Sequence, residues 1–153
     1  MQDLRKTGWW KSLGLDGYFA ADKPEPFIEL CVLSSMVAAG ADGSASAEEY
    51  DHIVTMVTLA TNGKADRDKL DDLVNGAVKQ LEEERGMDAL IEDVSDRATA
   101  GAGVRKAALA FAVACASSDG TVEDSEVETL KSLANALKLS AELDGVRAAI
   151  AKG

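Results

Sequence analysis

Two short acidic stretches have the residue types that bind a divalent cation. In SSDGTVEDSE (117–126), a glycine follows Asp119, and Glu126 comes seven residues after that aspartate. In GADGSASAEE (40–49), an aspartate–glycine pair and a glutamate have the same spacing. Ca²⁺ and Mg²⁺ both prefer oxygen ligands. The candidate metal ligands are therefore Asp42, Glu49, Asp119 and Glu126, with Ser46 and Glu123 as secondary candidates.

The spacing matches the second half of an EF-hand calcium loop but not the first half. With Asp119 at position 5 of such a loop, Gly120 falls at position 6 and Glu126 at position 12, as a calcium loop requires. Positions 1 and 3 would then be Cys115 and Ser117, and neither is a carboxylate. Because calcium takes six to eight oxygens, these are not EF-hands, and we expect any ion to bind with a Kd on the order of 10⁻⁴ M or weaker.

Helix capping explains many of the same residues without a metal. Ser46 and Glu49 have the S-x-x-E spacing of a capping box. Glycine permits the positive φ that a helix end often needs, and acids in a first turn complement the helix dipole. Capping explains less well why both an aspartate and a glutamate recur at one spacing. A weak divalent-cation site and simple helix caps therefore both remain open.

The segments that would position these loops are helical in pattern. The chain has only two prolines, and apolar residues recur at helical spacing in most segments between turns. We predict a single-domain, all-α helical bundle of about 7–8 helices. The expected helices cover about 24–41, 46–60, 67–85 with Gly86 as the stop, 87–97, 101–118, 122–138, and a short last helix capped by Ser140.

The two acidic loops also mark an internal repeat. An offset of 77 residues aligns Asp42 with Asp119 and Glu49 with Glu126. Each loop follows an apolar, small-residue segment and precedes an amphipathic one. We expect two pseudo-symmetric helix-loop-helix repeats, at about 27–61 and 104–138, in a helical domain of residues 23–153. Residues 1–22 form a separate N-terminal segment that could contain a short helix.

Composition narrows the class of partner. The net charge is −11, whereas binding nucleic acid needs clustered Lys and Arg, so we exclude nucleic acid and expect cations or a basic protein surface. No apolar stretch reaches the ~18 residues of a membrane span, and we expect a cytoplasmic protein. The sequence shows no nucleophile–base pair, phosphate-binding loop or metal-binding histidine set, so we expect a protein that is not an enzyme.

The sequence also allows predictions about the cysteines, the histidine and the two tryptophans. Cys31 and Cys115 stand in apolar runs, which is typical of buried, reduced thiols. The single histidine, His52, is interpreted as a surface residue. Trp9 and Trp10 are adjacent, and such aromatic residues either anchor an interface or pack on the body of the protein.

The repeat carries a resemblance to a known family. AFAVACASSDGTVEDSEVETLKSLANAL resembles the signature of the TerB-like tellurite-resistance family, and SSMVAAGADGSASAEEYDHIVTMV is similar to the family's first copy. The resemblance covers about residues 27–139. It implies an all-helical, non-catalytic interaction module of a tellurite or stress-response system, whose acidic loop residues chelate a metal. Here those residues are Asp42, Glu49, Asp119 and Glu126.

The resemblance also implies partners. Members of the family are thought to act with a TerC-like membrane protein and with TerD-like calcium-binding proteins, and a related domain occurs in membrane-anchored J-domain co-chaperones. A cytoplasmic protein held at the inner membrane by such a partner is therefore expected. The alternative is a plain helical protein–protein adaptor in which the acidic loops only cap helices.

Overall fold

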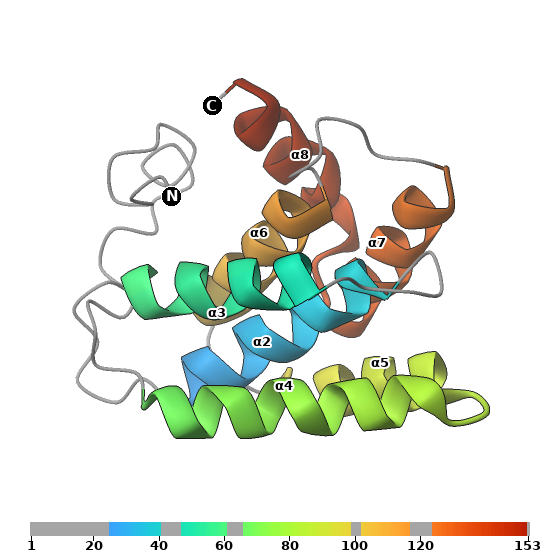
Figure 1. The fold of residues 1–153 in the computed structure, drawn as a ribbon. Coiled ribbons are helices and arrows are strands. Elements are labelled where there is room, and N and C mark those ends of the chain that lie inside the picture. Colours follow the sequence, from blue (N-terminus) through green and yellow to red (C-terminus); the bar gives the residue numbers. More distant parts are fainter. Residues whose placement is uncertain (1–24, 41–46, 61–65, 99–101, 117–123, 153) are drawn as a thin grey trace.

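The computed structural model describes residues 25–40, 47–60, 66–98, 102–116 and 124–152, and these ranges contain helices and no strand. The prediction of an all-α fold is confirmed (Figure 1). Residues 1–22 lie outside the described residues, and so do residues 41–46 and 117–123 of the two acidic stretches. In chain order the elements are α2 (Glu25–Ala39), α3 (Ala47–Ala60), α4 (Arg67–Glu82), α5 (Gly86–Asp96), α6 (Ala102–Ala116), α7 (Asp124–Ala136), the 3-10 helix η3 (Ser140–Glu142) and α8 (Leu143–Lys152).

Helices α2 and α6 pack against each other at the centre of the molecule, and this is the most extensive helix pair in the described structure. Both are apolar on nearly every face, so both need other helices around them. Helices α3, α4, α5 and α7 contact α2, and helices α3, α7 and α8 contact α6. Both helices bury small side chains, among them Ser34, Ser35, Ala38, Ala107, Ala108 and Ala112.

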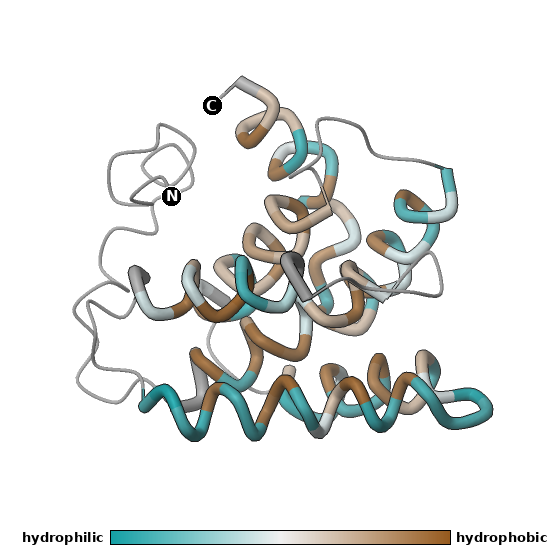
Figure 2. Tube along the Cα trace, viewed as in Figure 1, coloured by the Kyte–Doolittle hydropathy of each residue, from teal (hydrophilic) through white to brown (hydrophobic). Residues whose placement is uncertain are grey.

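The outer helices are amphipathic, as α4 illustrates. Its Leu70, Val74 and Ala77 are buried, whereas its charged side chains are exposed, and Figure 2 shows this division along the helix. The side chain of Asp66 caps the start of α4 by accepting a hydrogen bond from the backbone N–H of Asp68 at 2.9 Å. The apolar face therefore orients α4 on the core, and its acids face solvent.

The connection between α4 and α5 differs from the prediction. Helix α4 ends at Glu82, and Gly86 begins α5 instead of stopping α4. Arg85 takes the left-handed turn, with φ 61°. A Cβ added to Gly86 would overlap the carbonyl oxygen of Gln80. Glycine is therefore needed here because two backbones approach closely.

The last helix also begins later than predicted. Ser140 is the first residue of η3, and α8 starts at Leu143. The preceding helix, α7, ends at Ala136, and Lys138 beyond it takes the left-handed conformation, at φ 62°. The N–H of Leu139 donates to the carbonyl of Ala134 at 2.8 Å, which is the bond that closes a Schellman motif. This closure turns the chain into η3 before α8 can start.

Substitution of Gly86 by alanine should destabilise the fold. The added methyl would collide with backbone at Gln80, and overpacking of this kind costs about 2–3 kcal/mol. The matched control is Gly76→Ala, because a Cβ there meets nothing within 4 Å and a helix-interior alanine gains about 1 kcal/mol over glycine. Urea unfolding measures both. If both substitutions changed the free energy of unfolding equally, the close approach of Gly86 to the backbone of Gln80 would be contradicted.

Two buried hydroxyls in α2 give a second prediction. Ser34 and Ser35 are fully buried, and their Oγ atoms have no hydrogen-bond partner among the described residues. A buried hydroxyl without a partner costs about 1–3 kcal/mol. We therefore expect Ser34→Ala and Ser35→Ala each to raise the free energy of unfolding by roughly 1 kcal/mol, measured by thermal and urea unfolding. A loss of stability would show that the hydroxyls are hydrogen-bonded in solution.

Candidate functional site

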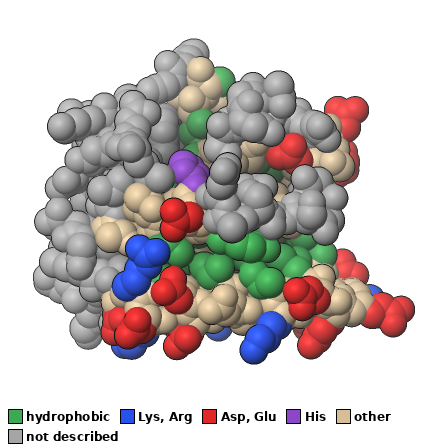
Figure 3. Space-filling view, in the orientation of Figure 1, with side chains coloured by type: hydrophobic (Ala, Val, Ile, Leu, Met, Phe, Trp, Pro, Cys, Tyr) green, Lys and Arg blue, Asp and Glu red, His purple; other side chains and the backbone are tan. Residues whose placement is uncertain are grey.

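An open groove with a volume of about 560 Å³ lies between α3 and α4. We call it the α3–α4 groove. Figure 3 shows hydrophobic side chains gathered in the hollow between these helices, with acidic side chains along α4. Val54 and Val74 are only 3% and 5% exposed, so they form the floor. The residues that line the groove are Tyr50, Asp51, Val54, Arg67, Asp71, Val74 and Asn75.

Helical spacing explains why these residues meet. Tyr50 and Val54 are four residues apart on α3, and Arg67, Asp71 and Val74 follow each other at intervals of four and three on α4. Side chains at these intervals share one face of a helix. Each helix therefore contributes one wall, with charged groups toward solvent and a valine toward the core.

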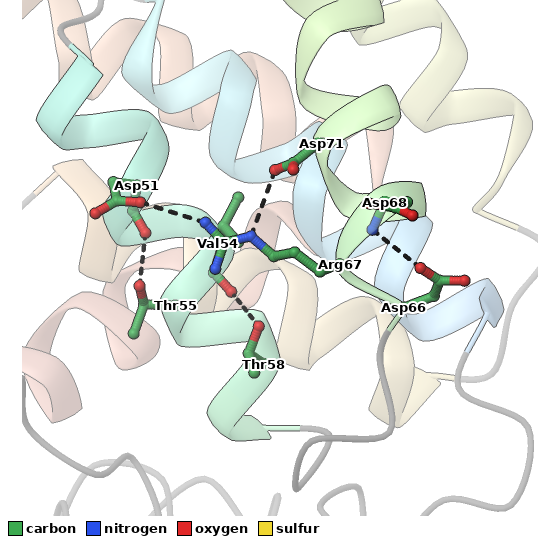
Figure 4. Close-up of polar contacts among 8 residues, drawn as sticks. All are labelled: Asp51, Val54, Thr55, Thr58, Asp66, Arg67, Asp68 and Asp71. Carbon is green, nitrogen blue, oxygen red and sulfur yellow. Dashed lines mark hydrogen bonds and ion pairs between the residues drawn. The ribbon is translucent and has the colours of Figure 1, made fainter.

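One arginine links the two walls (Figure 4). The Nη2 atom of Arg67 lies 3.6 Å from Oδ1 of Asp51 on α3, and its Nε lies 3.5 Å from Oδ1 of Asp71 on α4. The three side chains are 61%, 74% and 51% exposed, respectively. Ion pairs this exposed contribute about 0–1 kcal/mol. Another cation could therefore replace Arg67 at little cost.

The neighbouring hydroxyl groups on α3 are hydrogen-bonded along their own helix. Thr55 and Thr58 donate from Oγ1 to the carbonyls of Asp51 and Val54, each at 2.8 Å (Figure 4). These bonds orient both hydroxyls along α3. The charged groups of the groove are thus Asp51, Asp71 and Arg67.

The groove borders a strongly acidic surface. Residues 66–97, which include α4 and α5, carry eleven acidic and five basic side chains, a net charge of −6. All of these acids except Asp93 are exposed. Such a surface attracts cationic groups and repels anionic ones. The chemistry available at this face is therefore electrostatic and apolar binding.

The structure leaves the predicted metal ligands largely outside its described residues. Asp42, Ser46, Asp119 and Glu123 lie there entirely, and so does the side chain of Glu49. Glu126 is half-buried in the first turn of α7. In the described ranges, no group of three or more His, Cys, Asp or Glu side chains is placed to hold a metal ion.

Two candidate ligands can be compared by their backbone positions. Glu49 is the third residue of α3, and Glu126 is the third residue of α7. The two acids thus occupy the same position in their helices, and the internal repeat itself stays a prediction. This position suits both a metal ligand at the end of a loop and the glutamate of a capping box. The metal site remains a prediction.

The sequence analysis also made predictions for the two cysteines, the histidine and the two adjacent tryptophans. Cys31 and Cys115 are buried, reduced thiols, as predicted, and burial raises the pKa of Cys31 well above its usual value. His52 is half-buried, not a fully exposed surface residue, because α3 packs into the molecule near it; this burial lowers its pKa. Trp9 and Trp10 lie outside the described residues.

Sequence reasoning missed the α3–α4 groove. A signal was present in α4, where Arg67 and Asp71 share a face with the apolar Val74. An apolar stripe that begins with charged residues is typical of a face that lies only partly against the core. The second wall could not be assigned from sequence, because it depends on how α3 and α4 pack.

The described structure thus defines an all-α domain with an acidic exterior and an open groove. The family model described as tellurite resistance protein TerB matches residues 27–145. The chain therefore belongs to the TerB family, a domain associated with tellurite resistance. None of the curated proteins and none of the solved structures matches it. Across the described ranges, no helix has the length and apolar character needed to span a membrane.

The half-buried histidine gives a testable pH dependence. Burial favours neutral His52, so its pKa in the folded protein lies below the usual value of about 6.5. The unfolded chain therefore binds a proton more readily, and stability falls as the pH drops below about 6.5 toward the folded pKa. An NMR titration of the imidazole should give a pKa below that of a free histidine.

The control for this prediction is His52→Gln. Between about pH 7.5 and pH 5.5, the wild-type protein should lose more unfolding free energy than this variant. The carboxylates are common to both proteins, so their titration cancels in the comparison. If the unfolding free energy of the variant fell as much as that of the wild-type protein, or more, the lowered pKa of His52 would be contradicted.

Proposed function

We propose that this TerB-family domain is a non-catalytic interaction module of a tellurite or stress-response system. The observation that carries the proposal is the exposed acidic surface of α4 beside an open, partly apolar groove. Charged surfaces steer protein partners of opposite charge, and apolar grooves supply contact area. The two described groups with a shifted pKa, Cys31 and His52, owe the shift to burial, and neither lines the groove.

The second part of the proposal is a weak divalent-cation site at the duplicated loops. Its ligands would be Asp42, Glu49, Asp119 and Glu126, with Ser46 and Glu123 in support, and its ion Ca²⁺ or Mg²⁺. Two observations support it: the recurring Asp-Gly…Glu spacing and the matched third-residue positions of Glu49 and Glu126. Oxygen ligands of this type suit both ions.

The proposed partners follow from family membership and charge. A TerC-like membrane protein or TerD-like proteins would recruit the domain, which would then work in the cytoplasm at the inner membrane through that partner. The net charge of −11 supports a partner with a basic surface. The alternative is a plain helical adaptor, and it is favoured if the acids at the starts of α3 and α7 only cap those helices.

A calcium and then a magnesium titration of the protein, followed by amide NMR, tests the ion site. We expect saturable shifts of the Gly43 and Gly120 amides at millimolar ion. In the double variant Asp119→Asn/Glu126→Gln the shift should vanish at Gly120 and persist at Gly43, so the first loop is an internal control. If the amide shifts do not change up to about 10 mM ion, well above the weak end of the protein calcium range, the ion site is excluded and the plain helical adaptor is favoured.

A further inference from the structure

We propose that the α3–α4 groove binds a cationic amphipathic helix of a partner protein. This inference rests on the proposed interaction role and adds the surface and the chemistry of the partner. It depends on three features of the groove: two helical walls, an apolar floor and an acidic rim.

The shape of the groove suits a helix. Its walls are two helices, so an added helix would pack as helices pack in a protein core, with its ridges in the space between theirs. The lining on α4 runs from Arg67 to Asn75, which is about 12 Å or two turns at the helical rise. Amphipathic helices bind such grooves through apolar anchors at i, i+4 and i+7.

The floor offers matching apolar contacts. Val54 on α3 and Val74 on α4 lie at the bottom of the groove. Val78 follows Val74 by one turn and is half-buried against the core, which lengthens the apolar stripe along α4. Val54 and Val74 are almost fully covered already, and Tyr50 on α3 adds a half-buried aromatic side chain to the lining. A partner with an apolar face can pack on Tyr50 and on the edges of the two valines, which a simple polycation does not do.

The rim selects a positive charge. Asp51 and Asp71 stand on opposite walls, and Arg67 between them offsets one of the two charges. Asp68 and Asp72 extend the negative charge along α4 and are both exposed. Lys or Arg side chains that flank an apolar face could pair with Asp51 and Asp71 and displace the exposed, weakly held Arg67. An anionic partner would meet net repulsion.

A peptide helix fits the groove better than a small molecule does. Small-molecule sites enclose most of the ligand surface within apolar walls. The α3–α4 groove is open to solvent, and its rim is charged. An open groove of this kind buries one face of an occupant and leaves the opposite face in water, which is how an amphipathic helix binds.

The test is a titration of the isotope-labelled full chain with a synthetic 18-residue Leu/Lys amphipathic peptide. We expect saturable amide shifts at Val54, Val74 and their neighbours. The control peptide has the same composition in an order that removes the helical spacing of leucine. It should bind at least about 10-fold more weakly, a difference of about 1.4 kcal/mol.

Two neighbouring aspartates supply matched variants. Asp71 lines the groove, whereas Asp72 is the next residue of α4, is exposed and does not line it. Asp71→Lys should weaken binding of the Leu/Lys peptide about 10-fold, and Asp72→Lys less than about 3-fold. Asp51→Lys tests the opposite wall and should also weaken binding about 10-fold. Unfolding curves check that each variant is folded.

Four results would overturn the proposal. Equal weakening by Asp71→Lys and Asp72→Lys, or equal binding of the reordered peptide, would show nonspecific attraction to an acidic protein. In the free chain, nuclear Overhauser effects between the Trp9 or Trp10 indoles and the groove valines would assign the groove to the N-terminal segment. Groove shifts that depend on protein concentration would assign it to a second copy of the chain.

Failure of this proposal is separable from failure of the proposed function. The calcium and magnesium titration reads the Gly43 and Gly120 amides, which the peptide experiment does not use. If those shifts occur and the peptide does not bind the groove, the ion-dependent module stands and its partner binds another surface.

Discussion

The packing of α2 against α6 is the constraint on which the rest of the fold depends. Both helices are apolar on nearly every face, so each must be largely surrounded, and the remaining helices are arranged to do this. Several contacts recur in both halves, whereas α5, which contacts α2, α4 and α7, lies outside this pattern. Helix α2 contacts α3 and α4, helix α6 contacts α7 and α8, and each central helix also contacts the second helix of the other half. A duplicated unit would give this pattern, although the two-fold symmetry itself stays a prediction.

The outer helices need only one apolar face, and this frees the opposite face for charge. On α3, Ile53 and Val57 are fully buried, as is Leu70 on α4. Val54 and Val74 lie on the facing sides of these two helices, where they are almost fully buried and line the bottom of the groove. The α3–α4 groove is therefore a consequence of laying two amphipathic helices side by side over one apolar helix. Its acidic rim follows from the charge of α4.

The sequence was sufficient for the helices but not for their junctions or their contacts. Residues 25–39 and 102–116 are apolar on nearly every face, and this predicts two central helices. Gly86 was misassigned because a glycine after EEER has the local pattern of a helix stop, whereas its role is a close approach to Gln80. The Arg67–Asp51 pair joins residues whose proximity depends on the packing of α3 beside α4. Likewise, spacing identifies Asp119 and Glu126 as candidates but cannot show whether their oxygens converge.

The two proposed surfaces share α3, and their charges connect them. Glu49, a candidate metal ligand, is two residues from Asp51 on the groove wall. Two residues span about 3 Å along a helix axis, which is less than the Debye length of about 8 Å in physiological salt, so screening between these two backbone positions is incomplete. A divalent cation at the start of α3 would reduce the negative potential at the rim and weaken binding of a cationic helix. Because coupling between two sites is reciprocal, an occupied groove would in turn weaken ion binding by the same factor. Helix α3 contains a candidate metal ligand and also forms one wall of the groove. An ion could therefore change the affinity of the groove through charge alone, without a large conformational change.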